Sequence, residues 1–387
     1  MFSASEAAMP LHYRSFATIV MLLVPLLLHA APLSQTDARI AQILAQREQV
    51  RRIEKVALSW DGQQLAWIVS QHDKARLELA SASGRNARTV ALPGDCEPKD
   101  VRWAPRWNRL AILTRCKVDP SNTKPIRGAI WLLDVQAGNP PRKLADVNGF
   151  ADALEWSPDG KRIAFLYVAG ATRLPEATAS GNPRVGVIGG EDKQIEQIAS
   201  ISSDGGPPQA LTPQGLYVYE FRWAPSGQRI AYTAAPPPGD DNWWTAKLYT
   251  QDAQAGAAPK MILDPATVNG PLHGLQIALP RWSPSAARIF FIGGLMSDRG
   301  STGGDIYSVP ASGGAPVDMT TSVQVSPAWF VFMDERTLLV SQIASGHVQL
   351  AEYTIDENSA RQTRLWFTVP GNLGDGRAAA GGHFDQR

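Results

Sequence analysis

The sequence predicts an all-β fold built from repeated antiparallel hairpins, and two observations carry this prediction. The first is a strand–turn–strand pattern, which is clearest in residues 154–168 (LEWSPDGKRIAFLYV). Pro158 suits the first central position of a type I turn, Asp159 tolerates the next corner, and Gly160 supplies the left-handed residue that closes a hairpin. The second is that apolar residues fall on both faces of the strand after this turn, which predicts a sheet covered on both sides.

The same pattern recurs along the chain, which indicates a repeat architecture. Copies begin at Leu58, Trp103, Trp156, Trp223 and Trp282, and a shorter sixth copy begins at Phe332. Between copies lies a second unit, a short strand followed by a polar or glycine-containing turn, as in residues 130–138 and 305–314. Two hairpins per repeat make a four-stranded antiparallel sheet, and sheets with two apolar faces bury both when they are arranged radially. We therefore expect a β-propeller of six or more four-stranded blades. A β-sandwich is the alternative, although its strands usually carry one polar face.

Residues 1–31 are predicted to be a secretory signal peptide. Residues 16–28 (FATIVMLLVPLLL) form an apolar run with Arg14 before it and two alanines shortly after it. The run is short for a bilayer span and is followed by small residues, as in a cleavable leader. We expect a periplasmic or secreted protein. An uncleaved anchor is the alternative, and it would be the only contact with a membrane.

The rest of the chain divides into a helix, one propeller and a tail. Residues 32–52 are expected to contain a short helix, because Ile40, Ile43 and Leu44 share one helical face. The propeller is expected over residues 53–369. Residues 370–387 are rich in Gly and Ala without apolar periodicity, which predicts a disordered tail.

Two cysteines flank the hairpin of the second repeat. In an antiparallel hairpin the residue numbers of each facing pair have the same sum. This sum is 213 if Trp103 lies opposite Leu110, and the numbers of Cys96 and Cys116 sum to 212. The two thiols are therefore candidates for a disulfide in an oxidising compartment. Two unrelated buried thiols are the alternative.

The sequence shows no recognisable catalytic or cofactor motif. It contains no G-x-S-x-G nucleophile motif and no Gly-rich phosphate loop between a strand and a helix. The histidines outside the leader lack metal-ligand spacing. The net charge of +1 gives no reason to expect a nucleic-acid partner. We assign no catalytic residue, no cofactor and no metal.

Two insertion loops supply candidate residues for contact with a substrate or partner. Asn242, Trp243 and Trp244 follow two aspartates in one loop, and indoles beside carboxylates suit a peptide or an amine. The alternative is that the indoles belong to the blade core. Glu191 and Asp192 in the preceding insertion suit a substrate ammonium group, with a solvated acidic turn as the alternative. Such loops gather at one end of a propeller, so a peptide or protein ligand is expected there.

The repeats WSPDGKRIAF, WAPSGQRIAYTA and PRWSPSAARIFFIGG, with DIYSVPASGGAP after the last, resemble the N-terminal propeller of prolyl oligopeptidase family serine peptidases. The likeness is closest to their dipeptidyl aminopeptidase and acylaminoacyl peptidase branch. The segments DDNWWTAKLY and GGLMSDRGSTGGDIY look like that branch more specifically than the turn does. The resemblance covers residues 39–368, and TolB-like periplasmic propellers share the turn motif.

In the resembled family, the propeller caps a C-terminal α/β-hydrolase domain that carries a Ser-Asp-His triad, and it filters substrates by size. This sequence ends where that domain would begin, so we expect the chain to lack it and to contain no triad residue. The resemblance implies the non-catalytic, substrate-gating portion of a secreted or periplasmic exopeptidase, with a separate hydrolase domain as a partner. One alternative is a TolB-like propeller that binds a protein or peptide. Another is an enzyme with its site inside the propeller channel, which requires a convergent cluster of His or carboxylates that the sequence does not reveal.

Overall fold

The computed structural model describes residues 35–72, 74–121, 123–174, 194–237, 239, 242–296, 302–321 and 323–370. The predicted signal peptide and residues 371–387 of the predicted tail lie outside the described residues. The chain divides into two compact units, residues 1–48 and 49–387. The first contains the α-helix α1 (Gln35–Glu48), whose apolar residues Ile40, Ile43 and Leu44 are half exposed. No helix among the described residues is long and apolar enough to cross a membrane.

The second unit is all-β and holds five antiparallel sheets. The first sheet contains β1 (Arg52–Leu58), β2 (Gln64–Gln71), β3 (Lys74–Ser81) and β4 (Arg88–Val90), paired in that order. Three further four-stranded sheets follow the same order. They are β12 (Tyr217–Trp223), β13 (Arg229–Ala235), β14 (Lys247–Asp252) and β15 (Lys260–Leu263); β16 (Gln276–Trp282), β17 (Arg288–Gly294), β18 (Asp305–Pro310) and β19 (Val317–Asp318); and β20 (Ser326–Asp334), β21 (Thr337–Ala344), β22 (His347–Ile355) and β23 (Ala360–Pro370).

The remaining sheet has seven strands, because the second and third repeats share one long strand. It contains β5 (Glu97–Trp103), β6 (Arg109–Arg115), β7 (Arg127–Asp134), β8 (Arg142–Trp156), β9 (Arg162–Ala169), β10 (Gln197–Ser202) and β11 (Gln209–Ala210). Residues 142–148 of β8 pair with β7, and residues from Gly149 onward pair with β9. At the change of partner, Gly149 has φ +134°, and a Cβ there would lie 2.1 Å from the Val168 carbonyl oxygen. The six sequence repeats thus form five sheets rather than the six separate sheets that we expected.

The turn motif is closed by its serine and glycine. The Ser157 hydroxyl accepts a hydrogen bond from the Arg162 backbone N–H at 2.9 Å and donates one to Asp159 Oδ1 at 2.6 Å. Gly160 has φ +67°, the left-handed conformation that the sequence predicted for this position. In the fifth copy, Ala286 takes the same place with φ +60°.

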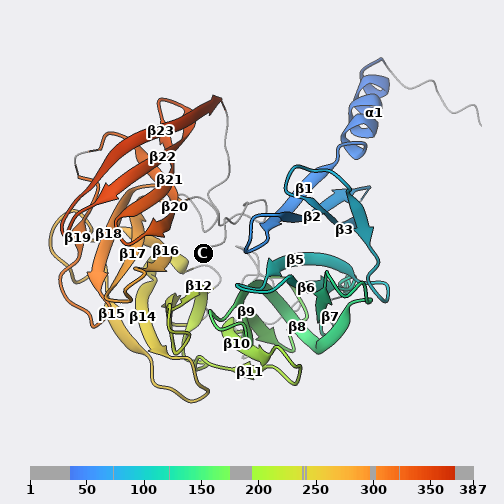
Figure 1. Cartoon of the computed structure of the whole chain (residues 1–387), viewed down its shortest axis with the longest axis horizontal. Helices are drawn as coiled ribbons and strands as arrows, with labels where there is room; N and C mark the ends of the chain where they lie inside the picture. The colour runs from blue at the N-terminus through green and yellow to red at the C-terminus, as the bar shows by residue number, and fades with distance from the viewer. Residues whose placement is uncertain are drawn as a thin grey trace, which may run out of the picture. The chain divides into compact units, whose positions relative to one another are not determined.

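The tryptophan that ends the first strand of four repeats links each of these repeats to the one before it. We call the strands that carry this motif residue, or its Leu58 or Phe332 equivalent, the leading strands: β1, β5, β8, β12, β16 and β20. The indole nitrogens donate across successive leading strands: Trp103 to Ala57 O at 3.0 Å, Trp156 to Arg102 O at 3.1 Å, Trp223 to Glu155 O at 3.3 Å and Trp282 to Arg222 O at 3.2 Å. Figure 1 shows the sheets of this unit following one another around a common centre.

The hydrophobic core is divided into clusters between successive repeats. One cluster joins Ile68 and Leu77 of the first repeat to Trp103 and Ile112 of the second, and the last joins the fifth repeat to the sixth. Because each repeat packs apolar side chains against the next repeat along the chain, the arrangement is consistent with a β-propeller. Among the described residues, no hydrogen bond joins the first sheet to the last.

Candidate functional site

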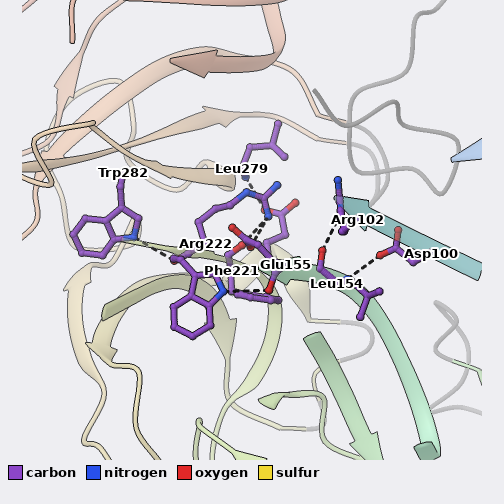
Figure 2. A network of polar contacts seen from close by, with 10 residues as sticks. Asp100, Arg102, Leu154, Glu155, Phe221, Arg222, Leu279 and Trp282 are labelled. Carbon is purple, nitrogen blue, oxygen red and sulfur yellow. Dashed lines mark hydrogen bonds and ion pairs between the residues drawn. The ribbon is translucent and has the colours of Figure 1, made fainter. Parts of the chain in front are cut away.

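Charged side chains gather on the leading strands of four consecutive repeats. Four of them immediately precede the motif tryptophan, and the other two lie two positions earlier on β5 and β12. The set consists of Arg102, Glu155, Arg222, Arg281, Asp100 and Glu220, and we call it the charge cluster. Figure 2 labels four of its members, Asp100, Arg102, Glu155 and Arg222. Asp100, Arg102 and Arg281 are buried, and the side chains of Glu155 and Arg222 are 23% and 22% exposed. Buried ionisable groups of both signs are a feature of functional sites.

Two carboxylates of the cluster bind backbone N–H groups that β-bulges have released. Asp100 Oδ2 accepts from the Leu154 N–H at 2.8 Å, and Glu220 Oε2 accepts from the Leu279 N–H at 2.6 Å (Figure 2). The register of β8 shifts beside Leu154 and that of β16 shifts at Leu279. Each bulge contains a residue in the left-handed region, Ala153 at φ +55° and Leu279 at +54°. These carboxylates therefore compensate for strained backbone in the following repeat.

Two arginines of the cluster have acceptors. Arg102 Nε donates to the Leu154 carbonyl oxygen at 2.9 Å. Arg222 Nη1 lies 3.4 Å from Glu155 Oε2 and donates to the Phe221 carbonyl oxygen at 2.7 Å. On the side of the first sheet, Lys55 Nζ lies 4.0 Å from Asp100 Oδ1. Ion pairs and hydrogen bonds of these side chains therefore connect the leading strands from β1 to β12.

Arg281 differs from the other arginines of the cluster. Its side chain is buried, with 4% of the residue exposed, and its Nε and Nη1 have no hydrogen-bond partner among the described residues. Burial lowers the pKa of this guanidinium well below its usual value; Arg222 and Arg102 lower it further, while Glu155 and Glu220 oppose them. A buried charged donor without an acceptor is expensive. The cluster therefore presents an unsatisfied cationic donor, which can bind an anion.

The candidate residues of the insertion loop have mainly structural contacts. Asn242 Oδ1 accepts from the Tyr219 hydroxyl at 2.9 Å, and its Nδ2 donates to the Pro236 carbonyl oxygen at 2.9 Å. Trp243 and Trp244 lie in the short 3₁₀ helix η2 (Trp243–Thr245), with ring centroids 6.3 Å apart in an edge-to-face arrangement. Trp243 packs against the core, whereas Trp244 is 50% exposed. Glu191 and Asp192 lie outside the described residues.

The structure joins Cys96 and Cys116 by a disulfide whose Cα atoms are 4.1 Å apart. Trp103 pairs with Leu110, and the register shifts by one residue at a bulge between Pro98 and Asp100. Beyond the bulge Glu97 pairs with Arg115, which places the two cysteines directly opposite each other. The bulge therefore explains why the numbers of paired residues sum to 213 at Trp103 and Leu110 but to 212 at the cysteines.

The sequence analysis missed the charge cluster, although a signal for it is present. Arg102, Glu155, Arg222 and Arg281 occupy the same place in four copies of the motif, directly before the tryptophan. The first and sixth copies have Ala57 and Val331 there. A charge repeated at one position of an otherwise apolar strand can be recognised without a structure. The described residues contain no group of three or more His, Cys, Asp or Glu able to hold a metal ion.

No protein-family model matches the chain, and no curated protein matches its sequence. Among solved structures, a prolyl endopeptidase matches 87% of this chain and 47% of its own, with 12% identity and a TM-score of 0.53. An oligogalacturonate lyase in complex with manganese matches 78% of this chain and 76% of its own, with 12% identity and a TM-score of 0.52. A putative TolB from Agrobacterium tumefaciens matches 70% of this chain and 80% of its own, with 18% identity and a TM-score of 0.43.

Two of these structural neighbours are of the kinds that the repeats resemble, a peptidase of the prolyl oligopeptidase type and a TolB. The chain spans about half of the prolyl endopeptidase and about three quarters of the lyase. At this identity the likenesses show the fold alone. A peptidase and a lyase share the fold, so the fold does not decide the activity.

Proposed function

We propose that the chain is a six-bladed binding propeller of the prolyl oligopeptidase type, secreted or periplasmic, which binds a peptide through its leading strands. In this role it is the non-catalytic, substrate-gating portion of an exopeptidase, and its partner is an α/β-hydrolase domain. One observation carries the proposal: four consecutive leading strands supply the charge cluster.

The fold itself does not need charges at these positions. Ala57 and Val331 are buried at the place equivalent to Arg102, Glu155, Arg222 and Arg281, 3% and 6% exposed, and their strands pair normally. Replacing buried ion pairs by apolar residues is often neutral or stabilising. Charges retained at four of six equivalent positions therefore favour a binding role over a structural one.

A peptide suits a site of this composition. The cluster holds three guanidiniums and three carboxylates, and a zwitterionic peptide offers one group of each sign together with backbone amides. Charge complementarity gives specificity, and it orients a ligand more than it adds affinity. Such a site can sort peptides before they reach a catalytic centre elsewhere, which is the gating role that the family resemblance implies.

Calorimetric titration of the purified full chain with short unblocked peptides tests the binding role. We expect saturable binding, and no turnover of aminoacyl or dipeptidyl amides by the chain alone. The double variant Glu155→Gln/Arg222→Gln should lose most of the binding, while Arg361→Gln on the exposed strand β23 should not. Absence of binding by any peptide would refute the proposal, as would peptidase turnover that copurifies with the chain.

The gating role has a separate test in the gene. We expect the DNA beyond the codon for Arg387, in frame or as a neighbouring gene, to encode a hydrolase domain with a G-x-S-x-G motif. If no such domain is encoded, the gating role fails and a stand-alone binding propeller is left.

A second candidate, a TolB-like propeller that binds a protein partner, is favoured by exposed apolar residues. Leu365, Trp366 and Phe367 on β23 are 46%, 46% and 44% exposed, and an edge strand of this kind is open to association. The loop residues Asn242, Trp243 and Trp244, with Glu191 and Asp192, are the proposed contacts at the propeller end. Once a partner is identified, Trp244→Ala should weaken its binding more than Trp60→Ala, which removes another exposed indole.

A further inference from the structure

We propose that Arg281 binds a carboxylate group of the ligand, a site that deepens the binding role proposed above and rests on it. The starting observation is that Nε and Nη1 of this buried guanidinium lack acceptors among the described residues. Native proteins satisfy nearly all buried polar groups, and an exception calls for an explanation such as an absent ligand.

The neighbouring groups do not supply the missing acceptors. Asp100 faces Lys55 and the Leu154 N–H. Arg222 lies against Glu155, and Glu220 accepts from the Leu279 N–H. Each of these contacts leaves Arg281 Nε and Nη1 unpartnered.

The charge balance around Arg281 favours a monoanion. The charged groups that act on it are Arg222, Glu155, Glu220 and Arg102. Lys55 offsets the charge of Asp100 at 4.0 Å, and the other four groups with Arg281 make three positive and two negative groups, so one positive charge is left over. A monoanion neutralises this charge, whereas a phosphate dianion would also face Glu155 and Glu220 at low dielectric.

A carboxylate is the monoanion whose geometry suits a guanidinium. The planar guanidinium presents its N–H groups in a rigid fork, and the two oxygens of a carboxylate accept from it in parallel. One edge of the guanidinium is formed by Nε and Nη2, and the other by Nη1 and Nη2. Because Nε and Nη1 lie on different edges, each edge has an N–H group without an acceptor. Such a group can be the C-terminus of a peptide or the acid of a uronic sugar.

Paired ligands separate the carboxylate from the rest of each molecule. The full chain is titrated by calorimetry with N-acetyl-trialanine and its C-terminal amide, and with a uronic acid trisaccharide and its methyl ester. We expect one free acid to bind at least about tenfold more tightly than its neutral derivative, as befits a charge-assisted pair. Arg281→Met should abolish this ratio, and Arg281→Lys should retain part of it.

The outcomes distinguish the two proposals. If the peptide acid and its amide bind equally well, or if Arg281→Met keeps the ratio, the carboxylate site is refuted while the peptide-binding role stands. If only the uronic acid binds, the carboxylate site stands and the peptide-binding role fails. If no ligand binds, both fail.

Stability measurements show whether Arg281 has a structural role instead. Arg281→Met removes a buried charge whose Nε and Nη1 lack acceptors, and it does so at similar volume, so the urea midpoint of the variant should equal or exceed that of the wild type. Binding of the acid should raise the wild-type thermal midpoint and leave that of Arg281→Met unchanged. A lower midpoint for Arg281→Met than for the exposed-site control Arg361→Met would assign Arg281 to the fold and refute the proposal.

Discussion

The guanidinium carbon of Arg162 lies 4.6 Å from the centroid of the Trp223 ring. Its Nη1 and Nη2 donate to the carbonyl oxygens of Ala253 and Gly227 at 2.6 and 2.7 Å. The arginine that ends the turn motif of one repeat thus covers the tryptophan that begins the motif of the next. Arg229 lies over Trp282 in the same way, at 5.4 Å. The repeated spacing of Trp and Arg therefore reflects contact between sheets as well as the turn.

Arg162→Ala should lower the free energy of unfolding by about 3 kcal/mol, because it removes two charge-assisted hydrogen bonds and a cation–π contact at a half-buried site. Urea denaturation of the full chain measures the change. Arg361→Ala, at an exposed position of β23, should alter stability by no more than about 0.5 kcal/mol. Equal effects of the two variants would show that the contact between repeats contributes nothing.

Adjacent turns also touch, and this contact can be isolated with a matched glycine. A Cβ on Gly160 would lie 2.1 Å from Cζ3 of Trp107. Gly84 has a similar φ of +77°, with nothing within 4 Å of a Cβ. Gly84→Ala should cost about 1 kcal/mol from the left-handed backbone alone, and Gly160→Ala about 3 kcal/mol because the indole must also move.

Trp107→Ala supplies the control for that comparison. In its background the cost of Gly160→Ala, measured by urea denaturation, should fall to that of Gly84→Ala. If the cost does not fall, the effect comes from the backbone of the turn and not from the indole.

Local features of the fold were predictable because they depend on residues close in sequence. The left-handed Gly160 and the pairing of Trp103 with Leu110 follow from the turn motif, and both are present. The shared strand β8 was not predictable. A glycine usually weakens a strand, whereas in the structure β8 continues through Gly149 with φ +134° and changes partner there.

The charge cluster was harder to predict than the fold for a geometric reason. Arg102, Glu155, Arg222 and Arg281 belong to separate repeats, and they meet only because successive leading strands lie side by side. Their common place before the tryptophan is visible in the sequence, but their convergence is not. For Asn242, sequence composition indicated a ligand contact, while its amide is held by Tyr219 and Pro236, partners that composition does not reveal.

Reduction of the disulfide should lower stability by about 3 kcal/mol, because the bond closes a loop between cysteines 20 residues apart. Urea denaturation with and without reductant measures the loss. The double variant Cys96→Ser/Cys116→Ser should match the reduced protein and should not respond to reductant. Two titratable thiols in the unreduced, denatured protein would contradict the bond.

The stability of the fifth repeat should depend on pH through Asp318. Burial raises the pKa of this carboxyl above 3.8, and Asp305 adds to the effect. The unfolded chain therefore ionises Asp318 at lower pH than the folded chain. The contribution of the carboxyl group to stability is complete below about pH 4 and falls as pH rises through the folded pKa.

The variant Asp318→Asn tests this dependence. Its amide oxygen can still accept from the Thr320 N–H, which donates to Asp318 Oδ1 at 3.0 Å, but it cannot ionise. The variant should match the wild type near pH 4 and exceed it in urea midpoint near pH 7, whereas Asp204→Asn on an exposed turn should follow the wild type throughout. A wild type that gains on Asp318→Asn as pH rises would mean that hydrogen bonds to the carboxylate outweigh its desolvation.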